Sequence, residues 1–122
     1  MLMFMHILIM CGTNCFSQGG FNNFGAKIFV VPVGFVAVEG GVINQNSGTF
    51  DNHGVIILKG NWTNNAGNAA FINSSPGTVI FLGDTQNIQG SDVTLFYNLS
   101  LEGTGIKYQK IDAMAEGTLA LN

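Results

Sequence analysis

The sequence predicts an all-β protein, a right-handed parallel β-helix (β-solenoid) of roughly five coils. Short runs rich in Val, Ile and Phe alternate with glycine along most of its 122 residues, and branched and aromatic side chains favour the pleated, half-buried surface of a strand. No window shows a sustained helical period. Similar residues also recur about 20 positions apart, which is typical of coils that stack on one another.

The expected strands follow one another from residue 26 onward. Ala26–Val38 is the longest run, and Pro32 and Gly34 break it into two short pieces because neither residue suits the interior of a strand. Further short runs of the same kind are Gly41–Asn44, Thr49–Asp51, Val55–Lys59, Asn61–Asn64, Ala69–Ile72, Thr78–Leu82, Asn87–Gln89, Thr94–Leu101, Ile106–Ile111 and Thr118–Leu121.

Regularly spaced glycines predict the corners of the coils. Gly41, Gly48, Gly54 and Gly60 are separated by seven, six and six residues, and glycine tolerates the backbone angles that sharp corners require. Asparagine is the next best corner residue, and in register with the next coil it can form a side-chain hydrogen-bond ladder. The same frame aligns four pairs of residues: Ile43 with Trp62, Asn46 with Asn65, Phe50 with Phe71, and Asn52 with Asn73.

An antiparallel β-sandwich is the alternative fold. It also uses short strands with turns at regular spacing. However, Asn-Gly and Asp-Gly, the strongest signals for a tight hairpin, never occur in the chain. The solenoid is therefore the favoured prediction.

The first 17 residues have a different character. Met1–Met10 reads MLMFMHILIM and is followed by small and polar residues, the pattern of a secretory signal peptide. We expect cleavage after Ser17, and a buried N-terminal strand or a membrane anchor are the alternatives. Both cysteines, Cys11 and Cys15, would leave with this leader. The mature segment, residues 18–122, would then be secreted or displayed at the cell surface, with no membrane span.

Composition excludes several functions. Charged residues are only 9% of the chain, with four Lys and seven acids, for a net charge of -3. A nucleic-acid binder needs a basic face for phosphates, so we expect no nucleic-acid partner. The acids are scattered, and neither a nucleophile motif nor a phosphate loop occurs. We therefore predict no catalytic residues, no cofactor and no enzymatic activity.

Metal sites are not expected either. His53 could act as a metal ligand or general base, but it is the only His outside the leader, and we interpret it as a solvated turn residue. Asp51, Asp84 and Asp92 lie in turns of a kind that can bind calcium. Calcium needs about six to eight oxygens, and the calcium-binding nonapeptide of some β-solenoids is absent.

Three aromatic residues are weak candidates for ligand contact: Trp62, Tyr97 and Tyr108. Exposed rings of this kind could stack on sugars, which suits an exported protein. The alignment of Trp62 with Ile43 favours core packing for Trp62. Tyr97 is the best candidate for an exposed position.

Two stretches carry a resemblance to a known kind of protein. Gly48–Gly67 reads GTFDNHGVIILKGNWTNNAG, and Gly77–Leu101 reads GTVIFLGDTQNIQGSDVTLFYNLSL. Both resemble repeats of large, secreted, adhesin-like surface proteins of Bacteroidetes. The resemblance implies a β-helix stalk or adhesin segment within a longer chain that ends in a sorting domain. No such domain is present, and Gly117–Asn122 looks like the middle of another coil, so we expect an N-terminal fragment truncated at its C-terminus.

The expected function is that of a non-enzymatic, exported structural or adhesive segment of a cell-surface repeat protein. Its partner would be an extracellular glycan or another surface molecule. The alternative is a carbohydrate-binding module, or the leading part of a polysaccharide-degrading enzyme. A third reading is a self-assembling fibre subunit, because the open strand edges of a solenoid can pair with another copy.

Overall fold

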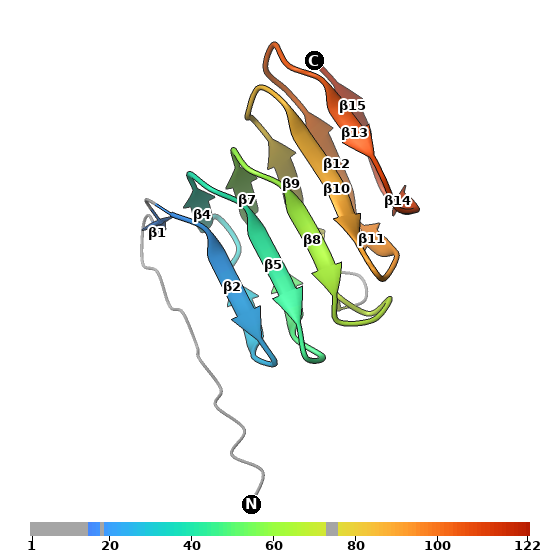
Figure 1. Ribbon diagram of the computed structural model, residues 1–122. Coiled ribbons are helices and arrows are strands. Elements are labelled where there is room, and N and C mark those ends of the chain that lie inside the picture. The colour runs from blue at the N-terminus through green and yellow to red at the C-terminus, as the bar shows by residue number, and fades with distance from the viewer. Residues whose placement is uncertain (1–14, 18, 73–75) are drawn as a thin grey trace, which may run out of the picture.

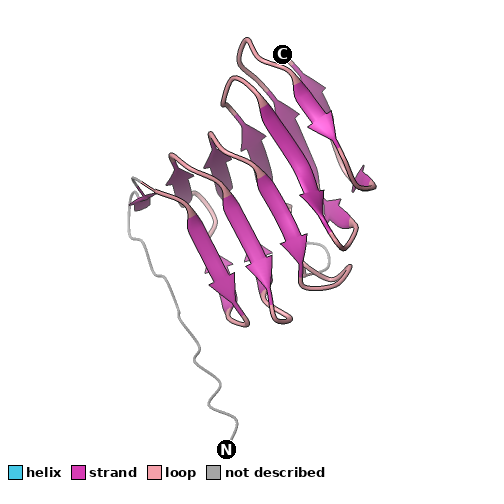
Figure 2. Cartoon of the chain, viewed as in Figure 1, coloured by secondary structure: helices cyan, strands magenta, loops and turns pink. Residues whose placement is uncertain are grey.

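The computed structural model describes residues 15–17, 19–72 and 76–122. These residues form 15 strands and no helix. The strands lie in parallel rungs that stack from the N-terminal end of the molecule to the C-terminal end (Figure 1; Figure 2).

Two long sheets form the largest faces of the molecule. The six-stranded sheet is built, in spatial order, from β1 (Cys15–Ser17), β4 (Phe35–Val38), β7 (Val55–Leu58), β9 (Thr78–Phe81), β12 (Asn98–Leu101) and β15 (Leu119–Leu121). The five-stranded sheet is built from β2 (Phe21–Phe24), β5 (Val42–Gln45), β8 (Trp62–Asn65), β10 (Gln86–Gly90) and β13 (Lys107–Gln109).

A third face is interrupted in its middle. It consists of one pair, β3 (Lys27–Val30) with β6 (Thr49–Asn52), and a second pair, β11 (Thr94–Phe96) with β14 (Ala113–Ala115). Between the two pairs, a single isolated bridge joins Phe50 and Phe71.

The chain visits the three faces in turn, so that each circuit makes one coil. Every strand pair among the described residues is parallel, and paired strands come from successive coils. The prediction of a β-solenoid of about five coils is therefore confirmed. An antiparallel sandwich is not formed.

Most expected strands are present, with differences at three kinds of position. The Thr94–Leu101 run splits at Tyr97 into β11 and β12, and Ala69–Ile72 forms only the bridge at Phe71. Two strands, β2 and β14, were not predicted, because their sequences FNNF and AMA carry few β-branched residues. β1 occupies the last three residues of the predicted leader, whose other residues lie outside the described part.

Side chains that alternate along the strands build one continuous core. β7 and β9 both show the pattern half-buried, buried, half-buried, buried, as expected for strands with one face inward. Aromatic rings fill the centre. Trp62 lies 5.5 Å from Phe50 and 5.6 Å from Phe96 between ring centroids, and Phe81 continues the stack at 6.0 Å from Phe96.

The register of the repeat differs by one residue from the predicted frame. Trp62 pairs with Val42, not with Ile43, and Asn65 pairs with Gln45, not with Asn46. Asn46 instead lies in a turn with a left-handed φ of 52°. The predicted frame was counted from glycine to glycine and therefore included turn residues, which shifted the alignment of the strands by one residue. The alignment of Phe50 with Phe71 is confirmed, and Asn73 lies outside the described residues.

An asparagine ladder lies inside the corner that follows the five-stranded sheet. Asn23, Asn44 and Asn64 are in register and are at most 2% exposed. The Nδ2 of Asn23 donates to Oδ1 of Asn44 at 3.0 Å, and Asn44 in turn donates to the carbonyl of Gly48 at 2.8 Å. The expected side-chain ladder is thus formed only between Asn23 and Asn44, and the inward-facing asparagines otherwise donate to backbone carbonyls.

The other two corners use the same device. At the corner before the six-stranded sheet, buried Asn52 accepts from the Gly54 N–H and donates to the Thr78 carbonyl. At the remaining corner, buried Gln86 accepts from the Gly83 N–H and donates to the carbonyls of Leu58 and Gly60. Each described corner amide thus replaces water for backbone groups that the sharp turns leave unpaired.

Gly60→Ala is expected to lower the free energy of unfolding by at least about 2 kcal/mol. The added Cβ would clash with the backbone of the neighbouring coil, and only a shift of that backbone could relieve the clash. A Cβ at position 60 would lie 2.3 Å from the backbone nitrogen of Gly41 in the coil below. Urea unfolding followed by circular dichroism measures the change. Gly19→Ala is the matched control, since a Cβ there meets nothing within 4 Å, and an equal loss in both variants would contradict this account.

Candidate functional site

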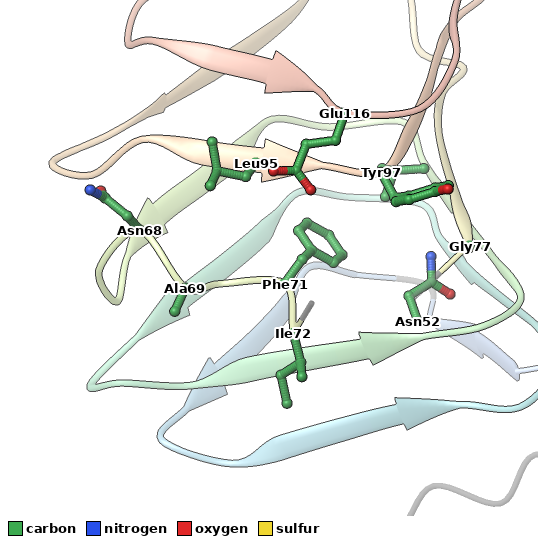
Figure 3. A pocket seen from close by; sticks show the side chains of 10 residues that line it. Asn52, Asn68, Ala69, Phe71, Ile72, Gly77, Leu95, Tyr97 and Glu116 are labelled. Atoms are coloured by element: carbon green, nitrogen blue, oxygen red, sulfur yellow. The ribbon is translucent and has the colours of Figure 1, made fainter. Parts of the chain in front are cut away.

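A pocket of about 220 Å³ opens on the third face, between β6 and β11. It occupies the gap where strand pairing on this face is reduced to the single bridge at Phe71. Figure 3 shows its lining residues, which come from four successive coils. The residues that shape it most are Asn68, Ala69, Phe71, Leu95, Tyr97 and Glu116.

A longer coil opens this pocket. Val42 and Trp62 are paired 20 residues apart, whereas Trp62 and Ile88 are paired 26 residues apart. Half of the six extra residues lie on the third face, since Val55 and Thr78 are paired 23 residues apart and Phe35 and Val55 only 20, and Gly67 turns the chain there with a left-handed φ of 89°. The other half lie at the corner between β9 and β10. Among the described residues of this coil, only the bridge at Phe71 lies between β6 and β11.

The floor of the pocket is apolar and is packed against the core. The Phe71 ring stacks on Trp62, with centroids 5.2 Å apart and planes at 19°, and it also contacts Phe50 and Phe96 at 5.6 and 5.5 Å. Leu95 points outward from β11 between buried Thr94 and Phe96. Phe71 is thus the outermost ring of the core aromatic cluster, held in place from below.

Polar groups stand at the mouth. Glu116 is placed beside Tyr97 because its N–H bonds to the Phe96 carbonyl and the Gly117 N–H bonds to the Tyr97 carbonyl, at 2.8 and 2.7 Å. In Figure 3 the Glu116 carboxylate extends over the Phe71 ring. The pocket therefore offers a carboxylate and a phenol above an apolar floor, which suits a small ligand with one apolar face and hydroxyl or amine donors.

The three aromatic candidates lie in three different places. Trp62 is 0% exposed and donates its indole N–H to the Thr94 hydroxyl at 2.9 Å. It packs in the core, so its candidacy as a ligand contact is wrong. Tyr97 is 38% exposed at the pocket mouth. Tyr108 is 47% exposed on β13 of the five-stranded sheet. The three rings do not form one platform.

His53 lies in the turn after β6 and belongs to a small charged cluster. Its Nε2 is 2.9 Å from Oδ1 of Asp51, whose Oδ2 is 3.1 Å from Nζ of Lys27. The ring also lies 5.5 Å from Phe29. Because the Lys27 side chain is 48% exposed, this cluster resembles a surface ion pair, worth at most about 1 kcal/mol.

The other acidic turns make local contacts. Asp84 accepts from the Thr104 hydroxyl at 3.2 Å, and Asp92 accepts from the Ser91 hydroxyl at 2.7 Å. Within the described ranges, no three His, Cys, Asp or Glu side chains gather in a way that could hold a metal ion.

The outer side of the five-stranded sheet forms a second candidate surface, here called the amide face. It consists of the uncharged polar side chains that point outward from four neighbouring strands or just precede one of them: Asn22, Gln45, Asn61, Thr63, Asn65, Asn87 and Gln89. In Figure 1 these strands, β2, β5, β8 and β10, follow one another as parallel rungs.

Sequence reasoning missed most of these residues. Glu116 was interpreted as one of several scattered acids, and Phe71 as a core residue. The sequence around a residue does not show whether that residue lines a pocket. The amide face left a weak signal. Its polar residues alternate with buried neighbours along four strands, as at Asn22, Gln45, Thr63 and Gln89. With the correct strand register, this alternation would have predicted that they share the outer side of one sheet.

Comparisons with known proteins identify no relative. No family model matches the chain, and neither a curated protein nor a solved structure matches it. A search of the described residues for helices of the length and apolarity needed to cross a membrane finds none.

Proposed function

We propose that this chain is a non-enzymatic, exported structural and adhesive segment of a cell-surface repeat protein. The observation that carries the proposal is the stack of parallel coils. About five coils are paired in parallel, and their corners are stabilised internally by buried amides. Each coil contacts mainly the coils before and after it, so this architecture extends by adding coils and holds surfaces at fixed spacing.

Two features of the sequence support display outside the cell. The apolar stretch Met1–Met10 followed by small residues has the character of an export leader. Charged residues are only 9% of the chain, and the polar surface is built largely from Asn, Gln, Ser and Thr. Such a surface needs neither a cofactor nor a metal to make contacts.

In this proposal the mechanism is mechanical. A stiff rod presents the pocket on one face and the amide face on another, and each makes a weak contact. Repetition of weak contacts along one rigid chain raises the overall affinity far above that of a single contact. Strength would therefore come from the number and alignment of sites.

The direct test uses intact source cells and an antibody against residues 18–122. The cells are treated with protease and blotted before and after treatment. We expect a band that disappears on treatment while a cytoplasmic marker survives. A band that stays protected in intact cells, and is cut only after lysis, would refute surface display.

A carbohydrate-binding module is the second candidate, and the pocket favours it. An apolar floor at Phe71 beneath Tyr97 and Glu116 suits one sugar ring, which has an apolar face and a polar rim. Tyr97→Ala is expected to lower binding to soluble oligosaccharides on a glycan array at least tenfold. Leu121→Ala removes another exposed apolar side chain, 71% exposed and on the six-stranded sheet, and is expected to have no effect. Silence of the parent chain across the array would rule this candidate out.

A further inference from the structure

We propose that the amide face binds the surface of a neutral, extended polysaccharide. The inference deepens the adhesive role proposed above by naming the class of partner, and its biological meaning rests on that role. It concerns a surface separate from the pocket, because the amide face belongs to the five-stranded sheet and the pocket to the third face.

The amide face itself carries no charged side chain, although β13, the fifth strand of the same sheet, begins with Lys107. The outward side chains of β2, β5, β8 and β10 include no acid, lysine or histidine. The third face, by contrast, carries Lys27, Asp51 and His53, and Lys59 pairs with Glu39 beside the six-stranded sheet. A partner of this face therefore gains nothing from charge, and a charged partner would lose its hydration without compensation.

Hydrogen bonds between coils hold these side chains in fixed orientations. Gln45 donates to Oδ1 of Asn22 at 2.9 Å, and Gln89 donates to the Thr63 hydroxyl at 3.2 Å. Asn87 donates to Oδ1 of Asn61, which lies in the preceding coil, at 3.0 Å. Each bond links side chains of two successive coils, so part of the face is ordered before any ligand arrives. Such preorganisation lowers the entropic cost of binding.

The spacing suits a polymer. Neighbouring rungs lie about 4.8 Å apart, so the amide face repeats amide and hydroxyl groups along the axis of the rod. Neutral polysaccharides present hydroxyl groups, each both donor and acceptor, at regular intervals along an extended chain. Exposed Ile43, and Tyr108 in register with Asn87, add apolar contacts of the kind that sugar rings accept. Several modest bonds in line then act together.

Other partners fit this face less well. Nucleic acids and acidic polysaccharides require cations, which β2, β5, β8 and β10 lack on their outer side. An extended peptide pairs with the open edge of a sheet, not with its surface. A second copy could match amide against amide, as in Asn- and Gln-rich interfaces, and the experiment below separates that outcome.

The test is co-sedimentation of the purified chain with insoluble cellulose, chitin and β-1,3-glucan, and with cross-linked polygalacturonate as an acidic comparison. We expect binding to at least one neutral polymer, unchanged between low and high salt, and no binding to polygalacturonate. The double variant Thr63→Ala/Gln89→Ala removes one inter-coil pair from the amide face and is expected to raise Kd at least tenfold. Thr49→Ala, on the third face, is the control and should leave Kd unchanged.

Three results would overturn the proposed binding of polysaccharide by the amide face. Lack of binding by the folded chain to all three neutral polymers would overturn the proposal, as would equal binding by the double variant with an unchanged unfolding midpoint. Sedimentation without polysaccharide would show self-association and would also overturn it. None of these results bears on export, which protease treatment of cells tests separately, and a protected intracellular chain would refute the adhesive role whatever it sediments with.

Discussion

Trp62→Ala is expected to lower the free energy of unfolding by about 4 kcal/mol or more. Trp62 is fully buried at the centre of the aromatic cluster, between Phe50, Phe71 and Phe96. Removing a large core ring costs about 3–5 kcal/mol through lost burial and an unfilled cavity. The substitution also leaves the buried Thr94 hydroxyl without its indole donor, which adds to the cost.

Urea unfolding followed by circular dichroism measures this effect. Trp62→Phe keeps a ring in place and should lose clearly less than Trp62→Ala, so the series stays informative if the alanine variant fails to fold. Tyr108→Ala is the exposed control and should lie within about 0.5 kcal/mol of the parent chain. A loss for Trp62→Ala no larger than that of Tyr108→Ala would contradict the central position of this ring.

Asn64→Leu is expected to lower the free energy of unfolding by about 2–4 kcal/mol, although leucine is nearly the same size. Asn64 is 0% exposed and makes three hydrogen bonds. It donates to the carbonyls of Gly67 and Val93, both at 2.9 Å, and accepts from the Ala66 N–H at 3.1 Å. Leucine would leave these backbone groups unpaired in a region that excludes water, and each buried unpaired group costs about 1–3 kcal/mol.

The neighbouring residue supplies the control for this prediction. Asn65 is exposed and accepts one hydrogen bond, from the Ser91 N–H at 2.9 Å. Asn65→Leu should therefore cost about 1 kcal/mol or less, because water can replace a lost bond at the surface. Equal losses in the two variants would show that the inward asparagines do not stabilise the corners as described.

The fold was predictable because a solenoid repeats its signals. The glycine spacing and the Val-, Ile- and Phe-rich runs recur in several coils, so errors in one coil did not alter the inference. The alignment of Phe50 with Phe71 held. The alignment of Trp62 with Ile43 failed by one residue, because Val42 is its partner. In a strand, a shift by one residue moves every side chain to the other face.

The candidate site was much less predictable. Tyr97 was expected to be exposed and lies at the pocket mouth. Glu116 and Phe71 were not singled out, since the pocket that joins them arises from strands that do not pair. For Tyr108, the sequence did not indicate which other residues would lie near it. The register with Asn87 places Tyr108 beside the amide face.

By itself, the sequence determined the fold class, the number of coils and the neutral, polar character of the surface, because composition and period are properties of the chain and do not depend on contacts. Only the tertiary structure decided which asparagines are buried in corners and which are exposed, and where the third face opens. Asn64 and Asn65 are adjacent in sequence, yet one closes a corner and the other meets solvent. Strand register separates them, and register follows from how successive coils pack.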